Sequence, residues 1–226
     1  MWRDEPPARE QRSQIVHTDS EKDRSPWTYD ETSGAYYLHH FYDFEPDLNV
    51  QNPAVQREIE KIISFWLQLG ASGFRIDAAP YIGSQDASHR DRDETHKILR
   101  EMRDVTSALR GDSVLIGEVD AEPDRLDRYF GDGHELQMLF NFVSNNYLFL
   151  ALAERSAEPL RRAFEQLPSV PWSCQWVHWV RNYDELDLER LSGKSARRFS
   201  NSSLPTPTCV SMDGDSTTAS SDGLRR

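Results

Sequence analysis

Three acidic side chains each follow a short apolar stretch, which raises the question of what chemistry they share. Asp77 ends the segment GFRID, Glu118 follows VLIG, and Asp184 follows the aromatic segment QWVHWVRNY. A charge at the end of a buried strand is costly unless it is paired or takes part in a reaction. Taken singly, each acid is more simply interpreted as a helix cap or an ion-pair partner. Their common position after three apolar segments is what points to one site.

Carboxyl groups brought together in this way suit the cleavage of a glycosidic bond. One carboxylate acts as nucleophile, and one carboxylic acid protonates the leaving oxygen. Arg75 lies two residues before Asp77, on the same face of the strand. Its positive charge is expected to keep the Asp77 carboxylate ionised and oriented.

The segments between these acids alternate between helix and strand. Apolar spacing predicts helices over residues 53–69, 93–109, 123–130, 143–153 and 157–167. Strands are predicted over residues 73–77, 113–118, 136–142 and 175–181. This alternation is typical of an α/β fold with a parallel sheet and outer helices. The carboxyl ends of parallel strands share one face, where ligands bind, so the three acids are expected to converge there.

The composition disfavours some classes of partner. The chain has 226 residues and a formal net charge of −12. An acidic surface does not favour nucleic acid or an anionic membrane, and it suits a neutral molecule such as a sugar. No apolar run reaches the length of a membrane span. Cys174 and Cys209 match no metal or redox spacing, so we interpret them as free thiols in a reducing, cytoplasmic compartment, and we expect no metal and no cofactor.

Composition also divides the chain into three segments. Residues 1–30 are polar and rich in charge and proline, which predicts loop or disorder. Residues 31–192 contain the alternating helices and strands and form the predicted catalytic domain. Residues 193–226 are rich in Ser and Thr without periodicity, which predicts a disordered tail.

The segments around the acids resemble, in order, the α-amylase family of glycoside hydrolases. GFRIDAAPYI is similar to that family's nucleophile strand, LIGEVD to its acid/base strand, and WVRNYDELDLERLS to its third carboxylate segment. The segments YYLHHF, EPDLNVQNPAV and FGDGHELQMLFNF look most like the oligo-1,6-glucosidase and trehalose synthase branch. The resemblance covers residues 25–192 and implies a partial (β/α)8 TIM barrel, of which strands four to seven are present.

The resemblance also implies a retaining reaction on an α-glucoside such as maltose or a short oligosaccharide. Asp77 would form a covalent glucosyl-enzyme, and Glu118, with a raised pKa, would act as acid and then base. Asp184 would stabilise the transition state, and Arg75 and Asn182 would bind substrate. Hydrolysis and maltose–trehalose interconversion both remain open, because both use the same intermediate.

Two departures from the family pattern support an alternative. The family usually has Asn-His-Asp where this chain has Asn182-Tyr183-Asp184, and a phenol replaces the imidazole that contacts the sugar. A complete barrel has eight strand–helix units and about 250 residues, whereas about four units are predicted here. The alternative is an inactive remnant or a carbohydrate-binding protein, and its exposed barrel edges favour self-association.

Overall fold

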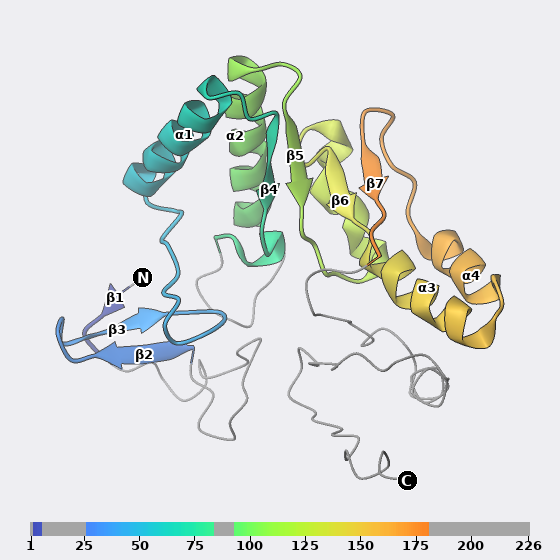
Figure 1. Cartoon of the computed structure of the whole chain (residues 1–226). Helices are drawn as coiled ribbons and strands as arrows, with labels where there is room; N and C mark the ends of the chain where they lie inside the picture. Colours follow the sequence, from blue (N-terminus) through green and yellow to red (C-terminus); the bar gives the residue numbers. More distant parts are fainter. Residues whose placement is uncertain (1, 6–25, 84–92, 181–226) are drawn as a thin grey trace, which may run out of the picture.

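The computed structural model describes residues 2–5, 26–83 and 93–180 (Figure 1). Within them, β4 (Gly73–Ile76), β5 (Val114–Gly117), β6 (Met138–Phe140) and β7 (Gln175–Val177) form a sheet in the order β4-β5-β6-β7. Every neighbouring pair in this sheet is parallel. The predicted α/β fold with four parallel strands is therefore confirmed.

The strands are shorter than predicted. Gln137, directly before β6, still pairs through its backbone, because its amide donates to the Leu115 carbonyl at 3.1 Å and its carbonyl accepts from the Gln175 amide at 2.9 Å, and its side chain adds two more hydrogen bonds. Gln137 Nε2 donates to the Ser113 carbonyl at 3.0 Å, and the Leu115 amide donates to Gln137 Oε1 at 2.9 Å. At the other end, the Ser144 amide donates to Asn141 Oδ1 at 2.8 Å, so a helix cap ends β6.

The helices agree closely with the sequence prediction. The predicted ones are α1 (Pro53–Gln68), α2 (Asp93–Leu109), η3 (Pro123–Gly133), α3 (Phe142–Glu154) and α4 (Glu158–Gln166), and the short η2 (Ala79–Tyr81) was not predicted. Asn52 caps α1 by accepting the Ala54 amide at 2.9 Å. Figure 1 shows α1 and α2 beside β4, and α3 and α4 beside β7. Within the described residues, no helix is long and apolar enough to cross a membrane.

A second, smaller sheet precedes α1. It has the order β1-β3-β2, with antiparallel pairs of β1 (Trp2–Arg3), β2 (Trp27–Asp30) and β3 (Ala35–Leu38). The prediction of loop or disorder over residues 1–30 is wrong for β1 and β2. Cross-strand aromatic pairs stabilise these strands, with the Tyr29 and Tyr36 rings 5.0 Å apart. Strands this short contain too few alternations to stand out in a charged segment.

The core lies between the parallel sheet and the helices that follow β4 and β5. Its members with no exposed surface include Leu99 of α2, Leu115 of β5, Tyr129 and Phe130 of η3, and Leu139 of β6. The first residue of β4 lets two strands approach closely: a Cβ on Gly73 would lie 2.0 Å from the Val114 carbonyl oxygen. Only glycine permits this spacing at the start of the two strands.

Candidate active site

Asp77 and Glu118 lie side by side at the carboxyl ends of β4 and β5. The register of the two strands pairs Ile76 with Gly117, so the next residue of each strand is an acid. The backbone continues this contact, because the Glu118 amide donates to the Ile76 carbonyl at 2.9 Å. The Ala79 amide donates to the Glu118 carbonyl at 3.0 Å. The expected convergence of these two acids is therefore present.

Arg75 contacts both carboxylates through one nitrogen. Its Nη2 lies 2.6 Å from Asp77 Oδ1, and the same nitrogen donates to Glu118 Oε2. Two short contacts to one nitrogen place the two carboxylate oxygens within about 5 Å of each other. The contact with Asp77 was expected from the sequence. The contact with Glu118 was missed, because it depends on which strand lies next to β4.

The two carboxyl groups have different environments. The Asp77 side chain is 72% exposed, whereas that of Glu118 is 19% exposed. Burial raises the pKa of Glu118 to about 7, the hydrogen bond with Asp77 adds to the rise, and the Arg75 charge opposes it. The raised pKa favours the protonated form of Glu118 at a pH where an ordinary glutamate is ionised. A carboxylic acid of this kind can both give and take a proton.

A strained residue shapes the chain directly after Asp77. Ala78 adopts the left-handed conformation, with φ of 43° and ψ of 44°, which is rare for a residue with a Cβ. The turn allows Ala79 to reach the Glu118 carbonyl and begins η2. Strain of this kind persists only where surrounding contacts hold it, and it is frequent beside functional residues. Nothing in the sequence signals it.

The other predicted site residues, Asn182 and Asp184, lie outside the described residues, as do Tyr183 and Cys209. The convergence of Asp184 with Asp77 and Glu118, and the contact of Asn182 with substrate, remain predictions. Cys174 is buried and free, and burial raises the pKa of its thiol. In the described part of the chain, no group of three or more His, Cys, Asp or Glu side chains could hold a metal ion.

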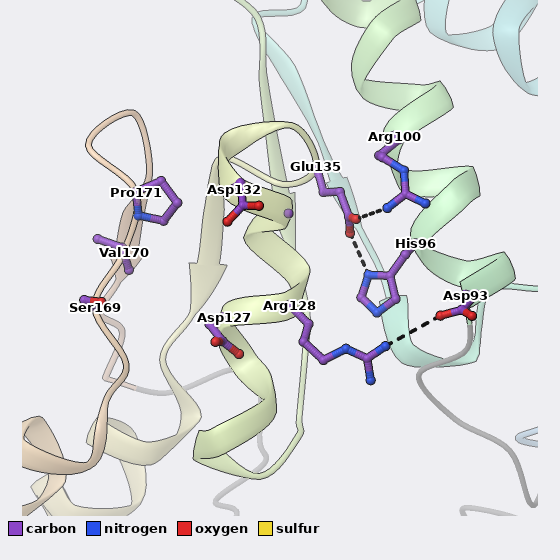
Figure 2. A pocket seen from close by; sticks show the side chains of 11 residues that line it. Asp93, His96, Arg100, Asp127, Arg128, Asp132, Glu135, Ser169, Val170 and Pro171 are labelled. Carbon is purple, nitrogen blue, oxygen red and sulfur yellow. Dashed lines mark hydrogen bonds and ion pairs between the residues drawn. The ribbon is translucent and has the colours of Figure 1, made fainter.

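A pocket of about 710 Å³ lies apart from the carboxylate pair, between α2, η3 and the loop before β7 (Figure 2). One of its lining residues is Glu135, whose side chain is only 2% exposed. Glu135 Oε2 lies 2.7 Å from His96 Nδ1, and Arg100 Nη1 donates to Glu135 Oε1 at 2.6 Å. These contacts join α2 to the chain entering β6. We call Glu135, His96 and Arg100 the Glu135 cluster. We interpret it as structural, because both oxygens of the buried carboxylate already have a partner.

Comparison with known proteins agrees with this geometry. Residues 2–205 match the family described as "Alpha amylase, catalytic domain". The chain is 35% identical over 192 residues to the trehalose synthase of Pimelobacter sp. (strain R48), which covers 80% of this chain and 33% of that protein. It is 34% identical over 137 residues to the oligo-1,6-glucosidase of Heyndrickxia coagulans, covering 52% of this chain and 24% of that one.

Solved structures support the fold. The trehalulose synthase MutB from Pseudomonas mesoacidophila MX-45 matches with a TM-score of 0.62 and 20% identity, over 80% of this chain and 36% of that one. The chain spans about a third of the length of the trehalose synthases that it matches. Its four parallel strands and their helices are part of a (β/α)8 barrel. The chain belongs to the α-amylase catalytic-domain family of glycoside hydrolases.

Proposed function

We propose that this chain carries the catalytic carboxylates of a retaining enzyme that acts on α-glucosides. The observation that carries the proposal is the shared contact of Asp77 and Glu118 with Arg75 Nη2. Retaining glycosidases hold their two carboxyl groups about 5–5.5 Å apart, whereas inverting ones leave about 6.5–9.5 Å for a water molecule. A pair that shares one nitrogen fits the retaining spacing.

In the first step, an Asp77 carboxylate oxygen attacks the anomeric carbon of the glucoside. The bond from that carbon to the leaving oxygen breaks, and Glu118 gives its proton to this oxygen. The product is a glucosyl ester on Asp77 and an ionised Glu118. The burial of Glu118 suits the proton donor, because it favours the protonated form of the carboxyl group.

In the second step, Glu118 takes a proton from water or from a sugar hydroxyl. The oxygen that loses the proton attacks the anomeric carbon, and the ester bond to Asp77 breaks. Water gives hydrolysis, and a sugar acceptor gives a new glucoside. The name of one relative, oligo-1,6-glucosidase, points to hydrolysis, and that of another, trehalose synthase, points to the formation of a new glucoside.

The remaining assignments belong to the same proposal. Maltose or a short oligosaccharide is the substrate, Asp184 stabilises the transition state, and Asn182 contacts the sugar. Arg75 keeps the two carboxylates in place and approaches the substrate. The reaction takes place in the cytoplasm without a cofactor, and residues 31–192 form the catalytic part of the chain.

A covalent trap tests the proposal directly. The chain is incubated with 5-fluoro-α-glucosyl fluoride, whose second step is slow, and labelled peptides are mapped by mass spectrometry. We expect one glucosyl adduct on Asp77, none in Asp77→Asn, and an adduct in Glu118→Gln because fluoride leaves without a proton. An adduct on another residue, or none on the unaltered chain, would contradict the proposal.

The exposure of Asp77 supports a second candidate, a carbohydrate-binding protein without turnover. A side chain that is 72% exposed leaves the reacting atoms open to water, whereas working sites exclude it. Calorimetry with maltose distinguishes the two. Saturable binding that is equal in the unaltered chain and in Asp77→Asn, together with no adduct in the trap, would favour binding alone.

A further inference from the structure

The loop that joins β3 to α1, residues 39–52, packs against the short helix that follows Asp77. Tyr81 is the last residue of this helix, η2. Its ring lies 5.6 Å from the ring of His40 and 5.1 Å from that of Phe41, with an interplanar angle of 61° in both pairs. Edge-to-face contacts of this kind are favourable between aromatic rings. We call His40 and Phe41 the ring pair.

Other contacts fix the position of this loop. His40 is 2% exposed, and its Nδ1 contacts Asp47 Oδ2, which lies on the same loop. The Asp47 amide donates to the Leu38 carbonyl at 2.9 Å, at the end of β3. Further along the loop, Gln51 Nε2 donates to the Gly83 carbonyl at 3.1 Å, shortly after η2. The loop is therefore anchored at its base and contacts the chain around η2 at two points.

The helix η2 directly follows a strained residue. Ala78 has φ of 43° and ψ of 44°, and alanine has no polar side chain that could stabilise this left-handed conformation. Such a conformation persists only if surrounding contacts impose it. One contact is the Tyr81 amide, which donates to the Ala78 carbonyl at 2.9 Å. Another is the Ala79 amide, which donates to the Glu118 carbonyl at 3.0 Å. Both hydrogen bonds depend on η2 staying in place.

We propose that the ring pair positions the nucleophile through Tyr81. The proposal rests on the assignment of Asp77 as that nucleophile. While the ring pair holds Tyr81, η2 keeps Ala78 in the left-handed turn, and Asp77 stays beside Glu118. Without these ring contacts, Ala78 relaxes towards a negative φ, because the left-handed region is unfavourable for a residue with a Cβ. The chain then leaves β4 in another direction, and the Asp77 carboxylate moves away from Glu118.

The kinetics of covalent trapping test the proposal. The variant His40→Asn/Phe41→Leu removes both rings of the ring pair, whereas the Asn amide can still donate to Asp47. With 5-fluoro-α-glucosyl fluoride, we expect the limiting rate of adduct formation on Asp77 to fall about 10–100-fold, because small displacements of a reacting group are costly. The concentration that gives half of this rate should stay within about threefold, since the ring pair acts on the nucleophile rather than on the sugar.

Substitutions on both sides of the ring contact show whether this contact carries the effect. Tyr81→Leu removes the ring on η2 and should lower the trapping rate by the same factor. The triple variant should lose no more than either variant alone, because residues that act through one contact are not additive. The control Phe44→Leu lies in the same loop, is 72% exposed and stacks its ring on Tyr42 at 5.1 Å, so it should have no effect.

Titration of Glu118, followed by its carboxyl ¹³C chemical shift, tests the same link without substrate. Burial raises the pKa of Glu118, Asp77 raises it further, and the Arg75 charge opposes the rise. If Tyr81→Leu moves Asp77 away, the pKa of Glu118 should fall below about 7, as expected for Asp77→Asn. In an Asp77→Asn background, Tyr81→Leu should cause no further fall. A role of Tyr81 confined to packing would have the same effect in both backgrounds.

Three results would overturn the proposal. One is a Glu118 midpoint that stays at about 7 in Tyr81→Leu while circular dichroism shows a native fold. Another is a fall of the same size with and without the Asp77 carboxyl. The third is an additive loss of rate in the triple variant. If Tyr81→Leu does not fold, His40→Asn/Phe41→Leu replaces it in the titration.

Failure of the proposed reaction is distinguishable from failure of this inference. An unaltered chain that forms no adduct would contradict the reaction alone. The titration needs no substrate, so it still decides whether the ring pair positions Asp77.

Discussion

Asp77 and Glu118 lie side by side because β4 and β5 pair with Ile76 opposite Gly117. Side chains alternate between the two faces of a strand, so a slip of one residue would send one carboxylate to the opposite face. The register therefore decides whether the acids form a pair. It also allows Arg75 to contact both from one nitrogen.

The pKa of Glu118 should respond in opposite directions to its two neighbours. Arg75→Gln removes the positive charge that favours the ionised form of Glu118, so the pKa of Glu118 should rise above about 7. Asp77→Asn removes a negative charge, so the pKa should fall below that value. Carboxyl ¹³C chemical shifts followed against pH measure both. A midpoint that both variants leave unchanged would contradict this account of the site.

Removing the Glu118 carboxyl should flatten the dependence of stability on pH. A raised pKa means that the native state holds a proton that the unfolded chain releases, so this stabilisation is present below about pH 4.5 and lost as pH rises to about 7. From pH 5.5 to 8, the unaltered chain should lose about 2 kcal/mol of unfolding free energy relative to Glu118→Gln. Urea unfolding followed by fluorescence measures the difference. Parallel pH profiles would show that Glu118 has no raised pKa.

The effect of removing the proton donor Glu118 should depend on whether the leaving group of the substrate needs a proton. Glu118→Gln cannot protonate the leaving oxygen, so glucosyl transfer from maltose to the enzyme should slow by about 10²–10⁴. With α-glucosyl fluoride, the same first step should stay within about tenfold. Rapid-quench measurement of the first turnover compares the two substrates. An equal loss with both would remove Glu118 from the role of acid.

The Glu135 cluster should be a large contributor to stability. Glu135→Gln leaves His96 and Arg100 without their buried carboxylate, which should cost about 3 kcal/mol of unfolding free energy. The matched control is Glu101→Gln on α2, whose exposed pair with Lys97 at 3.7 Å should contribute less than about 1 kcal/mol. Urea unfolding measures both variants. Equal losses of unfolding free energy in the two variants would show that the Glu135 cluster does not stabilise the fold.

The close approach of β4 and β5 should make Gly73 intolerant of a methyl group. Gly73→Ala would place a Cβ 2.0 Å from the Val114 carbonyl oxygen, and separating the strands should cost more than about 3 kcal/mol. Gly111→Ala is the control, since the nearest atom, the Ser107 carbonyl oxygen, is 4.0 Å away. Its effect should stay within about 1 kcal/mol. Thermal unfolding that ranks the two variants equally would contradict the strand spacing.

The sequence by itself determined the elements whose signal is local. The helix predicted over residues 93–109 has the bounds of α2, and Asn52 and Pro53 begin α1 as expected, because apolar spacing and capping act over a few residues. It also placed Asp77 and Glu118 at the ends of parallel strands. The family resemblance indicates the same two residues.

Tertiary structure decided what depends on residues distant in the chain. Arg75 and Glu118 are 43 positions apart, and His96 and Glu135 are 39 apart, so no spacing rule joins them. The burial that raises the pKa of Glu118 arises only when the sheet and its helices pack together. Local periodicity specifies which segments are helices and strands, whereas register and packing specify which charges meet and how far each is removed from water.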